Sequence, residues 1–129
     1  MSTRTVTVSG ATPPWAQAIS VGAHRFVSDE PVGVGTDEGP GPHELILAAL
    51  GACTAMTLRM YAQRKGWPLD DVLVTLRLEN DGTGPVVQRH IEFRGAIDPS
   101  QRARLLEIAG KCPVHRTLTA PLRIETTEC

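Results

Sequence analysis

A long apolar segment in the middle of the chain constrains the fold more than any other feature. Residues 44–65 favour helix, and residues 45–56 are apolar on every side of that helix. A helix that is apolar all round lies inside a structure, because none of its faces suits water. Gly66 and Pro68 end the helix. The sequence therefore predicts a buried helix that bears Cys53 and runs from the core outward to solvent.

The segments around this helix alternate polar and apolar residues, which is the period of a strand with one buried face. Four segments show the pattern to different degrees: 3–8, 19–27, 72–78 and 89–97. The last two are predicted to pair as antiparallel strands, because Asn80-Asp81-Gly82 supplies turn chemistry between them. Residues 122–126 are predicted to form a final strand. Strands that come in runs indicate an α+β fold.

Two further helix starts follow the paired strands. Asp-Pro-Ser-Gln at residues 98–101 matches a capping box, and its helix is predicted to last to about Gly110. Cys112, directly before Pro113, predicts a second, short helix. Earlier in the chain, residues 31–42 are rich in Gly and Pro, which predicts a long surface loop of the kind that often borders sites.

The size of the chain predicts one domain spanning residues 1–129, since 129 residues leave no room for a second core of ordinary size. A hydrophobic content of 41% and a charged content of 21% are typical of globular proteins. Aromatic residues make up only 4%, so the core is predicted to be aliphatic. A chain this small and aliphatic often completes its burial with a second copy, which favours a homodimer.

Charge and targeting signals narrow the possible partners. The net charge of −1 gives no basic field for phosphates, so nucleic acid is not expected as a partner. The N-terminus lacks the pattern of a signal peptide, and no segment is expected to reach membrane-spanning length. We therefore expect a cytoplasmic protein with no membrane partner.

The three cysteines are not a disulfide framework in a cytoplasmic protein. Cys53 lies in the most apolar helix, where a free thiol is often an inert hydrophobic residue. Cys112 precedes a proline at a helix start, where unpaired amides favour the reactive thiolate, although the residue also suits a purely capping role. Cys129 is the terminal residue and receives no role.

Several other chemistries lack support in the sequence. Cys112 and His115 have the spacing of a metal-ligand pair, but no second pair accompanies them, so no metal is expected. There is no Gly-Lys-Ser or Gly-Lys-Thr for a nucleotide phosphate and no Gly-x-Ser-x-Gly for a serine hydrolase.

Three stretches of the chain resemble one known family. Residues 41–56 (GPHELILAALGACTAM), 111–118 (KCPVHRTL) and 24–31 (HRFVSDEP) together resemble the OsmC/Ohr family of osmotically inducible and organic hydroperoxide resistance proteins. The resemblance covers nearly the whole chain. Two separate cysteine motifs make it specific.

The resemblance implies a thiol-dependent peroxidase of the oxidative stress response. Cys53 stands where the family attacks an organic hydroperoxide, and Cys112 stands where it resolves the sulfenic acid as an internal disulfide. The resemblance also implies an intertwined homodimer whose antiparallel strands wrap around the central helix and whose active sites are shared between chains. It implies no bound cofactor but an external dithiol reductant, for which a lipoyl-type dithiol is a candidate.

The resemblance further implies an acid and an arginine near the reactive thiol. Glu44 is the matching acid, but His43 occupies the position directly after the proline, where well-studied members carry theirs. Nine residues separate Glu44 from Cys53, roughly half a turn around an ideal helix. Glu44 would therefore fold back before the helix begins, serve the partner chain, or act only as a first-turn acid favoured by the helix dipole. Arg25 is the preferred arginine and Arg116 the alternative.

Two other functional classes remain open at this stage. One is an OsmC-like dimer without peroxidase activity that binds a small molecule or a thiol, with Cys53 buried and inert. The other is a thiol protein that acts on a different electrophile, such as a small acyl or disulfide substrate.

Overall fold

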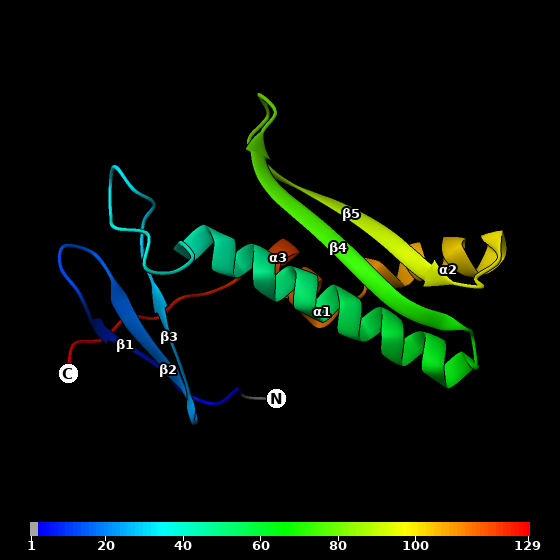
Figure 1. The fold of residues 1–129 in the computed structure, drawn as a ribbon, viewed down its shortest axis with the longest axis horizontal. Coiled ribbons are helices and arrows are strands. Elements are labelled where there is room, and N and C mark those ends of the chain that lie inside the picture. The colour runs from blue at the N-terminus through cyan, green and yellow to red at the C-terminus, as the bar shows by residue number, and fades with distance from the viewer. Residues whose placement is uncertain (1–2) are drawn as a thin grey trace. The chain divides into compact units, whose positions relative to one another are not determined.

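The computed structural model describes residues 3–129 and divides into two compact units, one ending at Ile46 and one running from Leu47 to Cys129 (Figure 1). Three helices and two antiparallel sheets make up the described chain, so the predicted α+β class is confirmed. Whether the two units act as the single predicted domain stays a prediction.

The first unit contains a three-stranded antiparallel sheet. β1 (Val6–Gly10), β2 (Gln17–Val21) and β3 (His24–Ser28) pair in the order β1-β2-β3. The prediction of one strand over residues 19–27 was wrong, because the chain reverses at Gly22. Gly22 adopts a φ of 59°, a left-handed conformation that glycine takes without steric cost, and Val21 pairs with His24 across the turn.

The loop after β3 is organised by one buried carboxylate. Asp29 accepts hydrogen bonds from the backbone N–H groups of Glu30, Thr36 and Glu38 and from the Thr36 hydroxyl. Burial raises the pKa of Asp29, but these hydrogen bonds outweigh it and hold that pKa below its usual value. The predicted Gly- and Pro-rich loop is therefore present, and a fixed internal anchor shapes it.

α1 (Pro42–Lys65) is the predicted helix that bears Cys53, and it starts two residues before the predicted start. Within one chain it is buried along a single stripe, at Leu50, Thr54, Leu58 and Ala62. Met56 and Met60 on the remaining surface are 59% and 61% exposed. Burial on every side is therefore not a property of the single chain, because the elements packed on α1 cover only this stripe.

The length of α1 corrects one prediction. The helix has 24 residues and includes an 18-residue window with a mean hydropathy of 1.5, so by length and composition alone it could cross a membrane. The expectation that no segment reaches such a length was wrong. The core helix of a soluble protein meets the same criteria, and the buried stripe of α1 contributes Leu58 to a protein core.

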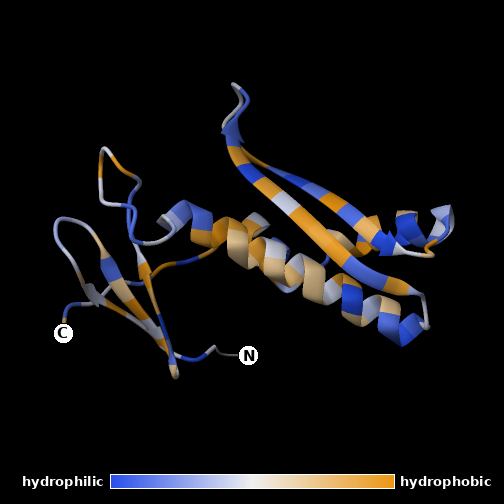
Figure 2. Ribbon diagram, in the orientation of Figure 1, coloured by the Kyte–Doolittle hydropathy of each residue, from blue (hydrophilic) through white to orange (hydrophobic). Residues whose placement is uncertain are grey.

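The second unit is built around the predicted strand pair. β4 (Leu69–Asn80) and β5 (Pro85–Gly95) are antiparallel, and Asn80 and Asp81 form hydrogen bonds within the turn that joins them. The hairpin, α1 and α2 (Pro99–Ala109) share one aliphatic core. Its buried residues are Leu58, Val72, Ile97, Leu105, Ile108 and Ala109. Figure 2 shows the matching alternation of apolar and polar residues along the two strands.

The predicted helix starts are confirmed, and the predicted final strand is not. Asp98 and Gln101 form the capping box of α2, and Cys112 is the N-cap of α3 (Pro113–Thr119). Residues 122–126 have no regular structure, so the prediction of a last strand was wrong. A strand needs a partner, and no described strand pairs with this segment, whose Leu122 and Ile124 are 65% and 83% exposed.

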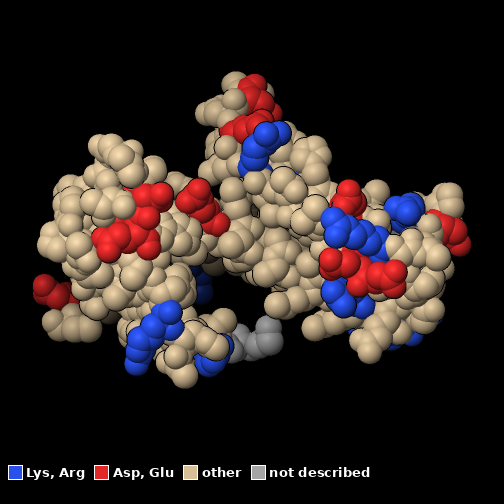
Figure 3. Space-filling view, viewed as in Figure 1, with Lys and Arg blue, Asp and Glu red and all other residues tan. Residues whose placement is uncertain are grey.

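Charges of both signs are interspersed on the surface of the second unit (Figure 3). Arg59 pairs with Asp71 at 3.3 Å, and Arg104 pairs with Glu107 at 2.8 Å. Both pairs are exposed to solvent, so each contributes about 1 kcal/mol or less to stability. Packing in the core therefore carries most of the stability of this unit.

Two adjacent leucines of α2 provide a test of this core. Leu105 is 0% exposed, whereas Leu106 is 55% exposed. We expect Leu105→Ala to lower the free energy of unfolding by about 2–5 kcal/mol, because it removes buried methyl groups and leaves a cavity. Leu106→Ala is the matched control and should cost less than about 1 kcal/mol. Urea unfolding followed by circular dichroism measures both, and equal losses would contradict the assignment of Leu105 to the core.

Candidate functional site

Cys112 lies at the junction of two helices. It caps the N-terminus of α3, where Pro113 occupies the first helical position, and its side chain is 0% exposed. The backbone N–H of His115 donates to Cys112 Sγ at 3.4 Å. The hydroxyl of Thr54 on α1 lies 4.0 Å from the same sulfur. The thiol is therefore held between α3 and α1.

Cys53 lies in the same turn of α1 as Thr54. Its side chain is partly buried, and its sulfur lies 4.0 Å from the hydroxyl of Thr57. Because Cys112 contacts Thr54, the residue next to Cys53, the fold brings Cys112 against the turn that carries Cys53. Both thiols are free in this structure.

Arg89 completes this group of residues, and the sequence reasoning missed it. Its guanidinium donates from Nη1 to Thr54 Oγ1 at 3.1 Å, and its Nη2 lies 3.1 Å from His115 Nδ1. A guanidinium can only donate, so Nδ1 is the acceptor and the ring proton of His115 lies on Nε2. Arg89 therefore bonds to the two residues that themselves contact the sulfur of Cys112.

The alternation of β5 was the signal that could have revealed Arg89. Successive residues of a strand face opposite sides, so Arg89 shares its side with Ile91 and Phe93. Both of these residues pack against the core of the second unit. An arginine at an inward position must find hydrogen-bond partners, because an unpaired buried charge is costly. The sequence shows the position, but only the fold shows that Thr54 and His115 are the partners.

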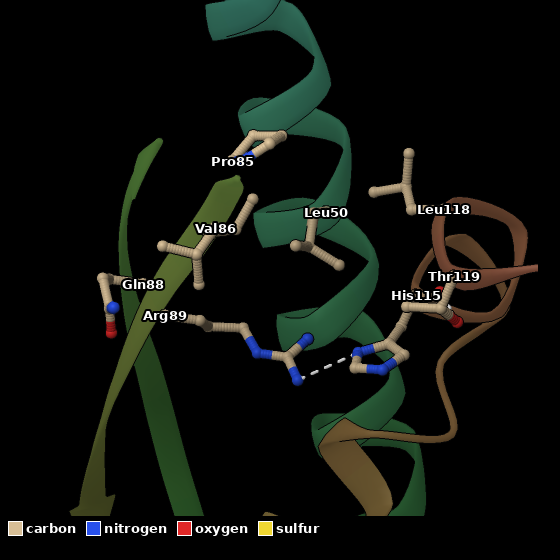
Figure 4. A pocket seen from close by; sticks show the side chains of 9 residues that line it. Leu50, Pro85, Val86, Gln88, Arg89, His115, Leu118 and Thr119 are labelled. Atoms are coloured by element: carbon tan, nitrogen blue, oxygen red, sulfur yellow. Dashed lines mark hydrogen bonds between the residues drawn. The ribbon is translucent and has the colours of Figure 1, made fainter. Parts of the chain in front are cut away.

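Arg89 and His115 also border a pocket with a volume of about 600 Å³. Figure 4 shows Arg89 reaching from β5 and His115 from α3, with Leu50 of α1 beside them. The pocket is lined by Leu50, Pro85, Val86, Val87, Gln88, Arg89, His115, Leu118 and Thr119. A mostly apolar wall with a few convergent polar groups is typical of sites for small organic molecules.

The two other predicted site residues lie in the first unit. Arg25 on β3 is exposed and donates from Nη1 to the hydroxyl of Ser20 at 2.8 Å. Glu44 lies in the first turn of α1, where its Oε1 accepts from the backbone N–H of Gly41 at 2.8 Å. Both contacts are local to that unit. Which of its three predicted roles Glu44 has stays a prediction.

The remaining candidates lie on or near α3. Arg116, the alternative arginine, is exposed on this helix. His115, considered as a metal ligand with Cys112, instead uses Nδ1 to bond Arg89. Among residues 3–129 no group of three or more His, Cys, Asp and Glu side chains could hold a metal ion.

Comparisons with known proteins give one result for the sequence and several for the fold. A family model described as OsmC-like protein matches residues 35–127. A search of curated proteins found no match.

Several solved structures share the fold. An OsmC-like protein from Mycoplasma pneumoniae superposes with a TM-score of 0.78 at 19% identity, covering 91% of this chain and 87% of that one. A protein from Legionella pneumophila described as an organic hydroperoxide resistance protein OsmC gives 0.69 at 20% identity, covering 92% and 90%. The organic hydroperoxide resistance protein OhrB of Bacillus subtilis gives 0.65 at 21% identity, covering 91% and 90%.

Proposed function

We propose that this chain, which belongs to the OsmC-like protein family, is a thiol-dependent peroxidase that reduces organic hydroperoxides with Cys53 and then forms a disulfide with Cys112. The observation that carries the proposal is the position of Cys112, whose sulfur lies 4.0 Å from Thr54, the helical neighbour of Cys53. A free thiol on α1 and a second free thiol against the neighbouring residue of that helix are what a peroxidase with an internal resolving cysteine requires.

The chemistry proceeds in three balanced steps. The Cys53 thiolate attacks the outer peroxide oxygen, so the O–O bond breaks and Cys53 becomes a sulfenic acid. The alkoxide that leaves takes up a proton and becomes an alcohol. The Cys112 sulfur then attacks the sulfur of Cys53, which forms the S–S bond and releases the oxygen as water. An external dithiol, for which a lipoyl-type dithiol is a candidate, reduces the disulfide and is itself oxidised. We propose that this cycle runs in the cytoplasm and needs no bound cofactor.

The first step needs a thiolate, and a thiolate needs compensating charge. Cys53 is partly buried on an apolar helix, where a nearby cation would stabilise the thiolate that the reaction uses. We propose that Arg25 supplies the compensating cation and that Glu44 orients it, either within one chain or across a dimer. In the structure Arg25 forms an exposed hydrogen bond to Ser20 and Glu44 forms a part-buried hydrogen bond to Gly41, and neither contact involves an opposite charge.

A second candidate function is binding without peroxide chemistry. The pocket of about 600 Å³ beside Arg89 and His115 favours it, because a binding protein needs such a cavity whether or not its thiols react. In that case Cys53 is inert and an OsmC-like dimer holds a small molecule or a thiol. The two functions differ in whether organic hydroperoxide is consumed.

The assembly is part of the proposal, and exposed apolar residues in both units support it. In the first unit, Val6 and Val8 of β1 are 54% and 58% exposed, and in the second unit Met56 and Met60 are exposed as well. We propose a homodimer that covers these surfaces and shares its active sites between chains. Sedimentation velocity should find twice the chain mass of 13.9 kDa. A folded monomer that persists at nanomolar concentration would exclude an obligate dimer.

Peroxide treatment tests the thiol chemistry directly. We expect one equivalent of cumene hydroperoxide to link Cys53 to Cys112, detected by peptide mapping in a Cys129→Ser background that removes the exposed third thiol. Cys53→Ser should abolish turnover. Cys112→Ser should permit one reduction per chain and leave a sulfenic acid that dimedone traps. Peroxide that is fully consumed while both thiols stay free would contradict the mechanism, and no consumption at all would favour the binding protein.

The proposed cation is tested by the pH profile of Cys53 alkylation. Arg25→Met removes the charge but keeps much of the side-chain length, so it should lower the alkylation rate at pH 7 by about tenfold and move the profile to higher pH. Arg116→Met is the matched control on α3 and should leave the profile unchanged. A shift in Arg116→Met alone would transfer the role to Arg116. Unchanged profiles in both variants would show that neither arginine activates Cys53.

A further inference from the structure

Arg89 carries a charge that no acidic side chain neutralises within residues 3–129. Five other arginines in this range form ion pairs with acidic side chains: Arg59, Arg77, Arg94, Arg104 and Arg123. Arg89 bonds only to neutral acceptors, the hydroxyl of Thr54 and the Nδ1 atom of His115. A partly buried guanidinium without a counterion favours the approach of an anion, because its charge is poorly screened by solvent.

The donors of this group are not exhausted. A guanidinium has five N–H donors in a fixed fork, and Arg89 uses two of them on Thr54 and His115. Three N–H groups of Arg89 therefore remain for a ligand. The proton on Nε2 of His115 adds one more donor from the same pair of side chains. An end of a pocket that offers mainly donors is suited to a carboxylate.

The rest of the pocket is suited to a hydrocarbon chain. Leu50 of α1, Val87 of β5 and Leu118 of α3 supply aliphatic side chains to its wall. Figure 4 shows the side chains of Leu50 and Leu118 beside the Arg89–His115 pair. The volume of about 600 Å³ is in the range of sites that bury small organic ligands.

We propose that this pocket binds an amphipathic organic monoanion, with its carboxylate on Arg89 and its alkyl chain against Leu50, Val87 and Leu118. One guanidinium balances one negative charge, so a carboxylate fits better than a phosphate dianion, which would bring a second charge without a partner. The carboxylate lies near Thr54 and His115, the two residues that contact Cys112. The site needs neither peroxide nor a reactive thiol, so it does not rest on the proposed peroxidase chemistry. It names the class of ligand for the pocket that supports the second candidate function.

Binding of decanoate and 1-decanol to the full chain tests the proposal by isothermal titration calorimetry without peroxide or reductant. The two ligands share a ten-carbon chain and differ in charge. We expect decanoate to bind about tenfold more tightly or better, because a hydrogen-bonded ion pair contributes more than a neutral hydrogen bond. Arg89→Met should remove this preference, because decanoate then loses an ion pair whereas 1-decanol loses only a neutral hydrogen bond. Arg94→Met, on the same strand but exposed and paired with Glu92, is the matched control and should behave like the wild type.

A second variant keeps the test decisive if Arg89→Met fails to fold, as circular dichroism would show. Leu118 is 44% exposed, so Leu118→Trp should be tolerated while its larger ring fills the pocket and weakens both ligands at least tenfold. Equal affinities of the wild type for decanoate and 1-decanol would overturn the proposal. The same holds if decanoate does not bind, if Arg89→Met folds and retains the preference, or if Leu118→Trp binds as the wild type does.

Discussion

The packing of one stripe of α1 against the β4–β5 hairpin and α2 determines both the core and the site of the second unit. Leu50, Thr54, Leu58 and Ala62 recur every four residues, which is the spacing of one helix face, and all four are buried. Three of them are apolar, and Leu58 belongs to the main core cluster. Thr54 is the exception, because it brings a hydroxyl group into the stripe.

The buried hydroxyl of Thr54 is tolerated because it is fully used. It donates to the carbonyl of Leu50 at 2.6 Å within the helix and accepts from Arg89 at 3.1 Å. A buried hydroxyl without partners would cost about 1–3 kcal/mol, so these bonds offset most of that penalty. The same two bonds fix the position of Arg89 relative to α1. A polar interruption of an otherwise apolar stripe is typical of a functional position, since a valine there would pack equally well.

Local signals in the sequence predict local structure correctly here. The capping box at Asp98, the N-cap at Cys112 and the turn at Asn80 depend on a few neighbouring residues, and all three form as predicted. The turn at Gly22 gave only a weak signal, because a single glycine between apolar residues also fits a continuous strand. Residues 122–126 have the composition of a strand but lack a partner within the described chain, and pairing is a tertiary property that alternation alone does not reveal.

The site was predictable only in part for the same reason. The cysteine motifs identify Cys53 and Cys112, but the meeting of Arg89 with His115 depends on how β5 and α3 pack around α1, and the two residues lie 26 positions apart. The predicted Arg25 and Glu44 lie in the other unit, where their contacts are local. Sequence patterns therefore identify the candidate thiols more readily than the charged groups of the site.

The unlike environments of the two thiols agree with the order of the proposed reaction. The first thiol must meet a bulky organic hydroperoxide, and Cys53 is the more accessible of the pair, being partly buried. The second thiol needs to meet only a sulfenic acid that is already part of the protein, so complete burial of Cys112 is no obstacle to it. Burial also keeps Cys112 from direct oxidation, because oxidants attack exposed thiolates first. The contacts of Cys112 with Thr54 and with the His115 backbone hold it against the turn that carries Cys53, as the second step of the proposed reaction requires.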